Sequence, residues 1–377
     1  MKFSTRALRT AACLASAVLT AGLPLSAGSI TGAYAADEPY TDGSSGSLNY
    51  RKFSDHIEIS GAKTDSDPTV IPSQIDGLPV TAIGMYAFQY SEMRSLELPD
   101  TLTVIDKYAF GYCKNLKSVT LPDSLKTMDL RTFEKCSALT EVNFPDHLVE
   151  TGEFSFEETP WLDAQRKKDP LVIVNGALVD ARTASGDVKV PSSVKYISPS
   201  AFSRNSKLTS VVLPSSISKI SDNVFWYCDN LTSAELNGAT TMGFGVFAAC
   251  NKLTDLKISG KLTKIDGYTF ADNSATATIT FYGSESKWNS VEKPAGDPFL
   301  SRARMVFDEN HQDPDEEVIG DINKDGNCDE RDVKLLADWL TAVPKTNLAD
   351  WKAGDMNKDQ KLTAVDLSLL KRHILSA

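Results

Sequence analysis

Hydrophobic positions recur along the middle of the chain with a period of 22 or 23 residues. The marker is a phenylalanine, found at Phe88, Phe110, Phe133, Phe156, Phe202, Phe225, Phe247 and Phe270. Successive intervals are 22, 23, 23, 46, 23, 22 and 23 residues, so the long interval equals two periods. A fixed period of this length is typical of a repeat architecture in which each unit contacts only its neighbours.

Each unit carries one segment with the periodicity of a strand. In 116–122, Val119 and Leu121 alternate with Ser118 and Thr120, which places the apolar side chains on one face. One such strand cannot bury that face alone, so stacked units predict a parallel sheet over a continuous core. We expect a leucine-rich-repeat solenoid at 48–307, with an outward row formed by Glu97, Thr120, Asn143, Val212, Glu235, Lys257 and Thr280.

A small residue follows each phenylalanine by three positions. It is Cys113, Cys136, Cys228 or Cys250 in four units, and Ser91, Asn205 or Asn273 in others. We expect this column to satisfy backbone groups of the turns, with the cysteines as buried thiols. The sequence leaves open whether Cys113 and Cys136, or Cys228 and Cys250, form disulfides.

The rhythm breaks once inside the solenoid, at about 157–187. Asp163–Asp169 predicts a short charged helix. Leu171–Val174 and Ala177–Asp180 flank Asn175-Gly176, a strong signal for a two-residue hairpin turn. We therefore expect a helix and a hairpin in place of one repeat.

The ends of the solenoid are expected to be capped. Residues 49–61 predict an extra strand pair before the first full unit, preceded by a flexible N-terminus at 36–47. At the other end 281–307, with Trp288 and Phe299, departs from the period, as a terminal unit must if it covers an exposed core.

These repeats resemble the BspA-type leucine-rich repeats of bacterial surface and secreted proteins. The segment 117–139, KSVTLPDSLKTMDLRTFEKCSAL, fits the pattern throughout. One departure is Asn237-Gly238, which stands where the pattern has proline. Such repeats also occur in adhesins, so the resemblance allows a role in adhesion to cells or to a host.

Two oxygen-rich segments follow an acidic linker at 308–318, and they start 34 residues apart. In each, oxygen-bearing side chains at positions 1, 3, 5 and 12 match a calcium loop, and the position 7 carbonyl faces the metal. We expect two Ca²⁺ ions, held by Asp321, Asn323, Asp325, Asn327, Asp329 and Asp332 in the first loop, and by Asp355, Asn357, Asp359, Lys361, Thr363 and Asp366 in the second.

The paired loops, each running into an apolar helix, resemble a type I dockerin at 319–377, a small all-α module. The resemblance implies docking to a cohesin module of a scaffoldin, in a cellulosome-type complex that degrades plant polysaccharides. It also implies an anaerobic bacterium, in which reduced thiols are at home. The expected fold class is thus an α+β multidomain chain.

The two copies differ where the family contacts its partner. At loop positions 10 and 11, the second copy has Ala364 and Val365 instead of a Ser-Thr pair. Positions 17 and 18 are Lys371 and Arg372, against Ala and Asp in the first copy. We expect these four residues to contact cohesin in a single orientation. Gln360 occupies the loop's glycine position, so we expect the second calcium site to be the weaker one.

Residues 1–35 are typical of a secretory signal peptide. Lys2, Arg6 and Arg9 precede the apolar segment 11–25, and Ala33-Tyr34-Ala35 precedes the expected cleavage site. Cleavage shifts the net charge from −11 to −14, which argues against nucleic acid as a partner. No later segment approaches eighteen apolar residues, so we expect no membrane span and a secreted, extracellular protein associated with a cell surface or a cellulosome.

Catalytic motifs are absent from the sequence. The four histidines are widely separated, and no nucleophile elbow, zinc-protease helix or phosphate loop is present. The outward row has no aromatic ring; Tyr90, Tyr112, Trp226 and Tyr227 lie in the turns instead. We therefore expect a non-catalytic binding protein whose ligand, protein or glycan, is not defined. Adhesion and an unrecognised glycoside hydrolase activity remain the alternatives.

Overall fold

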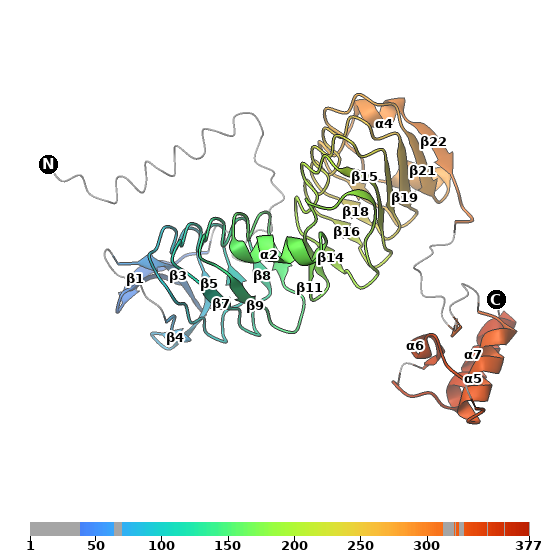
Figure 1. The fold of residues 1–377 in the computed structure, drawn as a ribbon, viewed down its shortest axis with the longest axis horizontal. Coiled ribbons are helices and arrows are strands. Elements are labelled where there is room, and N and C mark those ends of the chain that lie inside the picture. Colours follow the sequence, from blue (N-terminus) through green and yellow to red (C-terminus); the bar gives the residue numbers. More distant parts are fainter. Residues whose placement is uncertain are drawn as a thin grey trace.

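The computed structural model describes residues 38–63, 70–311, 320, 322–323, 328–344, 346–357 and 359–376. Figure 1 shows a solenoid of stacked coils, interrupted once by a helix, and a separate helical module at the C-terminus. The expected fold class is confirmed. The expected signal peptide at 1–35 lies outside the described residues, as does most of the linker.

The N-terminal end of the solenoid is an antiparallel cap. β2 (Leu48–Lys52) pairs with β3 (Ile57–Ala62), as expected for residues 49–61, and β3 pairs in parallel with β5 (Leu78–Ile83). β4 (Gln74–Ile75) forms a short hairpin with β5.

Within the segment 36–47, expected to be a flexible N-terminus, β1 (Thr41–Ser45) pairs along its whole length with β2. Its side chains are mostly exposed. Backbone hydrogen bonds across the turn at Gly46, which has φ +56, therefore hold β1 where hydrophobic patterning gives no signal.

Two lines of parallel strands run along the solenoid. In the coils before the insertion, which we call the first arm (residues 48–156), they are formed by β6 (Val104–Ile105), β8 (Thr127–Met128) and β10 (Glu150–Thr151), and by β7 (Ser118–Thr120) with β9 (Glu141–Asn143). In the second arm (residues 177–307), one line holds β16 (Lys219–Ile220), β18 (Thr241–Met242) and β20 (Lys264–Ile265), and β14 (Tyr196–Ile197), which pairs with β12 (Ala177–Asp180), lies next to β16. The other holds β13 (Gly186–Lys189), β15 (Leu208–Leu213), β17 (Ser233–Leu236), β19 (Asp255–Ser259), β21 (Thr278–Tyr282) and β22 (Arg304–Phe307).

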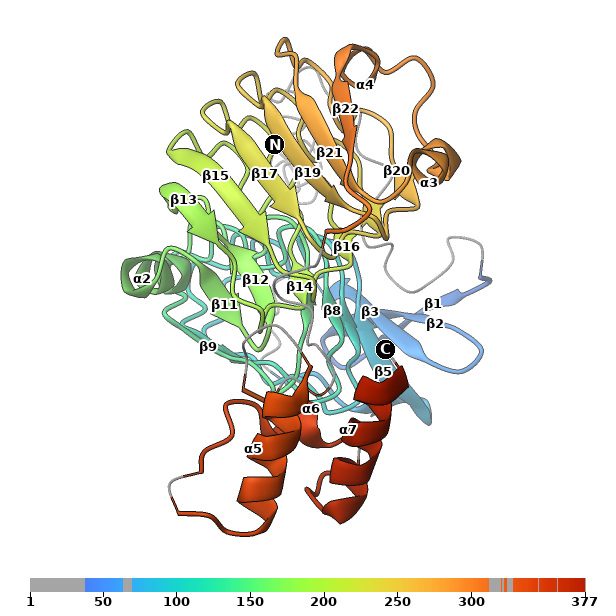
Figure 2. The same ribbon diagram turned by 90° about the vertical axis from the view of Figure 1, so that its right-hand side faces the viewer.

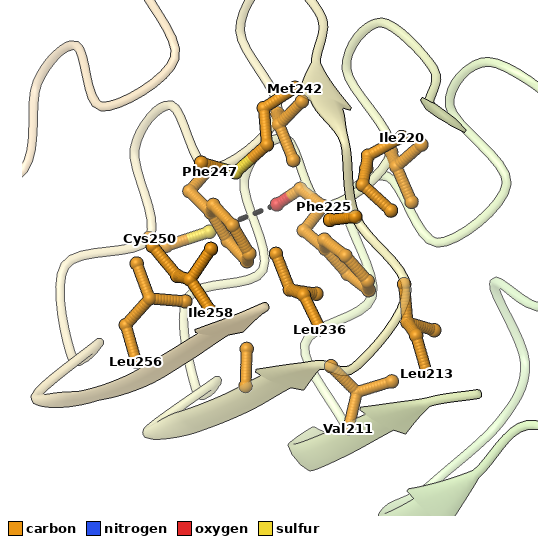
Figure 3. Close-up of a cluster of buried hydrophobic side chains, with 14 of the residues drawn as sticks. Val211, Leu213, Ile220, Phe225, Leu236, Met242, Phe247, Cys250, Leu256 and Ile258 are labelled. Carbon is orange, nitrogen blue, oxygen red and sulfur yellow. Dashed lines mark hydrogen bonds between the residues drawn. The ribbon is translucent and has the colours of Figure 1, made fainter. Parts of the chain in front are cut away.

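The repeat phenylalanines form a buried stack in each arm. Phe88 and Phe110 lie 5.4 Å apart between ring centroids, and Phe110 and Phe133 lie 5.2 Å apart, with nearly parallel rings. Figure 3 shows the corresponding stack in the second arm, where Phe225 and Phe247 are 5.1 Å apart and surrounded by Leu, Ile, Val and Met. The period read from the sequence is therefore the period of the core.

The cysteine column has the structural role expected for it. Among the described residues none of these four cysteines forms a disulfide. Each thiol is fully buried and donates a hydrogen bond to the carbonyl of the phenylalanine one coil earlier. Cys228 Sγ donates to Phe202 O at 3.1 Å, and Cys250 Sγ donates to Phe225 O at 3.0 Å (Figure 3). Burial raises the pKa of the Cys228 thiol to about 12, so this thiol stays protonated and inert.

The insertion is a helix followed by a hairpin, as expected. α2 (Pro160–Lys168) is capped by Thr159, whose hydroxyl accepts the N–H of Leu162. β11 (Val172–Val174) and β12 (Ala177–Asp180) pair across Asn175-Gly176, both residues having positive φ. α2 takes the place of a strand after β9, so the outer sheet stops there and restarts at β13.

The C-terminal cap extends the phenylalanine stack with a residue outside the period. Between α3 (Glu285–Ser290) and β22, α4 (Pro298–Arg302) places Phe299 against Phe270, with ring centroids 4.5 Å apart. Trp288 packs against Phe281 with tilted rings, 5.3 Å apart between centroids. The end of the core is thereby covered, as expected.

The outward row follows the register expected from the sequence. Thr120 lies opposite Asn143, and Glu235 lies between Val212 and Lys257. Among the described residues, no helix is long and apolar enough to cross a membrane.

Candidate metal centre

The C-terminal module consists of α5 (Glu330–Leu340), α6 (Trp351–Gly354) and α7 (Ala364–Ser376). α5 and α7 lie side by side in Figures 1 and 2 and are in contact. Ile322, Leu336 and Leu370 are fully buried between them. One residue from the first loop thus shares a core with both long helices.

Backbone hydrogen bonds join the two halves. Gly320 N–H donates to Ala353 O, and Asp350 N–H donates to Ile322 O, both at 3.0 Å. Gly320 has φ +91, and a Cβ there would come within 2.5 Å of Leu370 Cδ1. Glycine is therefore required before the first loop, where the chain passes close to α7.

The last carboxylate of each loop is buried and tied to the loop's backbone. Asp332 Oδ1 accepts the N–H groups of Ile322 and Asn323 at 2.9 and 3.1 Å. Asp366 Oδ1 accepts the N–H of Asn357 at 3.3 Å in the second loop. Both aspartates are 0% exposed. Each joins the start of its loop to the helix that follows.

These aspartates also cap the helices. Asp329 is the N-cap of α5, and its N–H donates to Asp332 Oδ2 at 3.0 Å, which completes a capping box. Thr363 N–H donates to Asp366 Oδ2 at 2.9 Å before α7. Burial raises the pKa of the Asp366 carboxyl, but hydrogen bonds from Thr363 and Asn357 outweigh that effect and keep the pKa below its usual value.

Hydrogen bonds within the second loop hold its first oxygen-bearing side chains close to one another. Asp359 N–H lies 3.1 Å from both Asp355 Oδ1 and Asn357 Oδ1. Gln360 N–H donates to Asp355 Oδ2 at 2.7 Å. Asp355, Asn357 and Asp359 therefore lie close together. Asp366 is linked to them because its Oδ1 accepts the backbone N–H of Asn357.

The donor set of the second loop suits calcium. Carboxylate, amide and hydroxyl oxygens at this spacing are the ligands that a hard cation with six to eight oxygens takes. Within the described ranges no group of three or more His, Cys, Asp and Glu side chains forms a metal cluster. The loop's donors differ from such a cluster, because they include an amide, a hydroxyl and the backbone carbonyl of Lys361.

Gln360 has the backbone conformation expected at loop position 6. Its φ is +64, in the left-handed region that favours glycine. Three expected ligands of the first loop, Asp321, Asp325 and Asn327, lie outside the described residues, whereas Asn323, Asp329 and Asp332 lie within them.

The expected partner contacts form one exposed face. Ala364, Val365, Lys371 and Arg372 are all exposed on α7, seven residues apart in pairs, so each pair is two turns apart on the same side of the helix. The equivalent face of α5 is covered by its own charges: Lys334 and Asp338 form an ion pair at 2.5 Å.

The fold and the two loops define a leucine-rich-repeat solenoid with a C-terminal dockerin. A family model for the BspA type leucine rich repeat region matches six copies over residues 80–165 and 181–290. The chain belongs to this family, and the gap between the matched stretches, 166–180, contains the end of α2 and the hairpin. A model for the dockerin type I domain matches residues 319–375.

Solved structures of bacterial repeat proteins are similar to this chain. A leucine rich cell surface protein from Faecalibacterium prausnitzii is 20% identical, with 70% of this chain and 100% of that chain covered and a TM-score of 0.32. A leucine-rich repeat protein from Bacteroides ovatus is 22% identical, with 73% and 67% covered and a TM-score of 0.35. The chain matches no curated protein.

Proposed function

We propose that this chain is a secreted, non-catalytic binding protein that docks through a calcium-loaded dockerin to a cohesin of a scaffoldin, in a cellulosome-type complex. In this proposal, residues 1–35 are removed on export and the solenoid at 48–307 presents a binding surface. Residues 308–318 link the solenoid to the dockerin at 319–377, which binds two Ca²⁺ ions.

The observation that carries the proposal is the difference between the two long helices of the dockerin. In the part of the chain that the structure describes, Lys371 and Arg372 make no ion pair, and Val365, two turns earlier on α7, is 56% exposed. On α5 the cation of Lys334 is neutralised by Asp338. The face of α7 can therefore meet acidic groups of a partner, whereas the face of α5 has already paired its charge.

Calcium has a structural role in this proposal. The oxygens of Asp355, Asn357 and Asp359 carry partial or full negative charge at close range, which costs free energy unless a cation compensates. Binding free energy becomes folding free energy when the site does not exist in the unfolded chain. Calcium thus holds α7 in the position from which its exposed face contacts cohesin.

The test is capture of the mature chain, residues 36–377, on immobilised type I cohesin modules. We expect capture in millimolar calcium and release by a chelator. Capture that is equally strong without calcium, or absence of capture by every cohesin tested, would contradict the proposal. Adhesion to cells without cohesin binding would favour the adhesin alternative. Turnover of plant polysaccharides by residues 36–307 would favour the hydrolase alternative.

A further inference from the structure

The backbone ladder that runs along the solenoid is interrupted at the insertion. Within the first arm each coil donates hydrogen bonds to the next; Phe110 N–H, for example, donates to Thr132 O at 2.9 Å. One line of strands ends at β10, the other ends at β9, and β12 pairs with β14 instead. Among the described residues, no backbone-to-backbone hydrogen bond joins 38–168 to 170–311. Apart from the chain itself, side chains therefore hold the two arms together.

The apolar core is divided at the same place. The phenylalanine stack of the first arm ends at Phe156, which packs against Trp161 with ring centroids 4.6 Å apart, and a new stack begins at Phe202. In the hairpin, Val172 belongs to the core of the first arm and Leu178 to that of the second. Figure 1 shows α2 at the point where the two arms meet. Each arm thus has a core of its own, and the hairpin contributes to both.

Charged side chains connect the arms, in a cluster that we call the joint network (Glu157, Arg166, Asp180 and Arg182). Arg166 on α2 donates to the two carboxylate oxygens of Asp180 on β12, through Nε at 2.8 Å and Nη2 at 2.9 Å. Arg182 Nε donates to Asp180 Oδ2 at 2.6 Å, and its Nη2 donates to Glu157. The Arg182 guanidinium also lies 4.8 Å from the centroid of the Phe154 ring. The network therefore joins the last coil of the first arm and α2 to the strand that opens the second arm.

The joint network is largely shielded from solvent. The side chains of Arg166 and Arg182 are 18% and 17% exposed, and that of Asp180 is 4% exposed. A guanidinium that makes two parallel hydrogen bonds to a carboxylate fixes the orientation of both groups as well as their distance. Because salt screens buried charges only weakly, the pairing persists at physiological ionic strength. The network therefore fixes the direction of the second arm relative to the first.

A second set of side-chain contacts also crosses the joint. Thr151 Oγ1 and Ser198 Oγ lie 2.5 Å apart, and Tyr196 OH donates to Thr151 O at 3.1 Å. Ser200 Oγ donates to Glu153 Oε1 at 2.6 Å. These groups are polar, and they can bond to water instead when the arms move apart. Neighbouring coils within an arm, in contrast, can separate only by breaking the backbone ladder and uncovering stacked phenylalanines. The joint is therefore the boundary at which the arms can move without disrupting either phenylalanine stack.

We propose that the joint network locks the two arms at one angle, and that without it the arms reorient as two folded units. The pivot is the β11–β12 hairpin, because β12 pairs with β14 of the second arm while Val172 packs in the core of the first. The joint also divides the outward row: Thr120 and Asn143 lie on one sheet, whereas Glu235 and Lys257 lie on another. The angle at the joint therefore decides how the two halves of the row face a common ligand.

The test measures the distance between the arms by double electron–electron resonance, on the mature, calcium-loaded chain. Spin labels at Asp123→Cys and Asn289→Cys, both exposed positions, report on the first and the second arm. Cys328→Ser is included because Cys328 is not fully buried, unlike the cysteines of the solenoid. We expect one narrow distance distribution in this labelled chain. Arg166→Ala with Arg182→Ala should at least double the width of that distribution.

The matched control is Arg131→Ala, which removes the same kinds of contact inside the first arm. Arg131 pairs with the carboxylate of Glu134 at 2.6 Å and lies 5.1 Å from the centroid of the Phe154 ring. Because these contacts do not cross the joint, their removal should leave the distribution unchanged. Arg182→Lys is the conservative variant. Lysine keeps the charge but lacks the planar fork of arginine, so we expect an intermediate width.

The proposal would be overturned by a broad distribution in the labelled chain itself, by an unchanged distribution in the double-alanine variant, or by equal broadening in Arg131→Ala. Circular dichroism and thermal unfolding are measured for every variant. Unfolding of the arms in the double-alanine variant would make the network part of the cores, and would also overturn the proposal. Cohesin is not used in any of these measurements, so they are independent of the docking proposed above.

Discussion

The backbone N–H of Gln360 donates to Oδ2 of Asp355 at 2.7 Å while Gln360 itself has φ +64. The hydrogen bond holds the side chain of Asp355, the first expected ligand of the second loop, and it requires the left-handed turn. Since the residue at the turn is not glycine, the left-handed backbone conformation at Gln360 costs roughly 1 kcal/mol when the loop forms.

Gln360→Gly should therefore tighten calcium binding at the second site. A gain of about 1 kcal/mol corresponds to roughly five-fold in affinity, measurable by calorimetry on the mature chain. Ala342→Gly is the matched control, because Ala342 also has positive φ (+55) but lies outside both loops. That variant should leave both calcium affinities unchanged; an equal gain in the two variants would show that the effect is not local.

Removing calcium should unfold the dockerin while the solenoid stays folded. The dockerin core is small: among the described residues its fully buried apolar side chains are Ile322, Leu336 and Leu370, whereas each arm has its own large core. A ligand at 100 times its Kd contributes about 2.7 kcal/mol of stability. We expect a chelator to reduce helical circular dichroism with little change in the strand signal, and added calcium to restore it. Loss of the strand signal as well would contradict this separation.

Most of the solenoid was predictable because the residues that carry the period are the core residues. Phe110 and Leu116 are 0% exposed, so the spacing of these residues in the sequence directly reflects which positions are buried. The start of α2 was placed three residues late, although Thr159 followed by Pro160 is a recognisable cap and first-turn pair. β1 had no such signal, because exposed strands pair through the backbone.

The dockerin loops were predictable as oxygen patterns, but the second role of their last aspartates was not recognised. The spacing of Asp329 to Asp332, and of Thr363 to Asp366, is that of a capping box. This double use accounts for aspartate at position 12, since the side chain reaches back to the helix N-cap. Tyr90 and Tyr112 were recognised as aromatic residues in turns, but the stacking of Tyr86 on Tyr108 was not, because the left-handed φ on both sides of each phenylalanine follows from the coil geometry.

Charge reversal at Lys371 and Arg372 should abolish docking to an acidic cohesin. Both side chains are exposed, so Lys371→Glu with Arg372→Glu should leave the fold and calcium binding intact. We expect affinity for cohesin to fall at least ten-fold, measured by surface plasmon resonance. The control is Lys334→Glu on α5, which should have little effect if a single orientation is used. Unchanged affinity in the α7 variant, or equal loss in both, would rule out docking led by α7.

The stability of the first arm should depend on the protonation of Asp129. Its side chain is 3% exposed, and within the described residues its Oδ2 accepts no hydrogen bond. Burial raises the pKa of this carboxyl from 3.8 to about 6. The folded chain therefore holds the proton more tightly than the unfolded chain does, and stability falls as the pH rises from about 4 to 6.

Asp129→Asn should remove this part of the pH dependence. The Oδ1 of Asp129 accepts the N–H of Leu130 at 2.6 Å, and the amide oxygen of asparagine can do the same. The loss of unfolding free energy between pH 4 and pH 7 should be smaller in the variant by at least about 1 kcal/mol, because one unit of pKa shift corresponds to about 1.4 kcal/mol. Asp123→Asn, at an exposed position in the same coil, serves as the control and should keep the slope of the original chain. Urea unfolding at both pH values measures the difference in unfolding free energy. If this free energy changed with pH equally in the original chain and in Asp129→Asn, Asp129 would be ionised in the folded protein at no cost in stability, which would contradict the prediction.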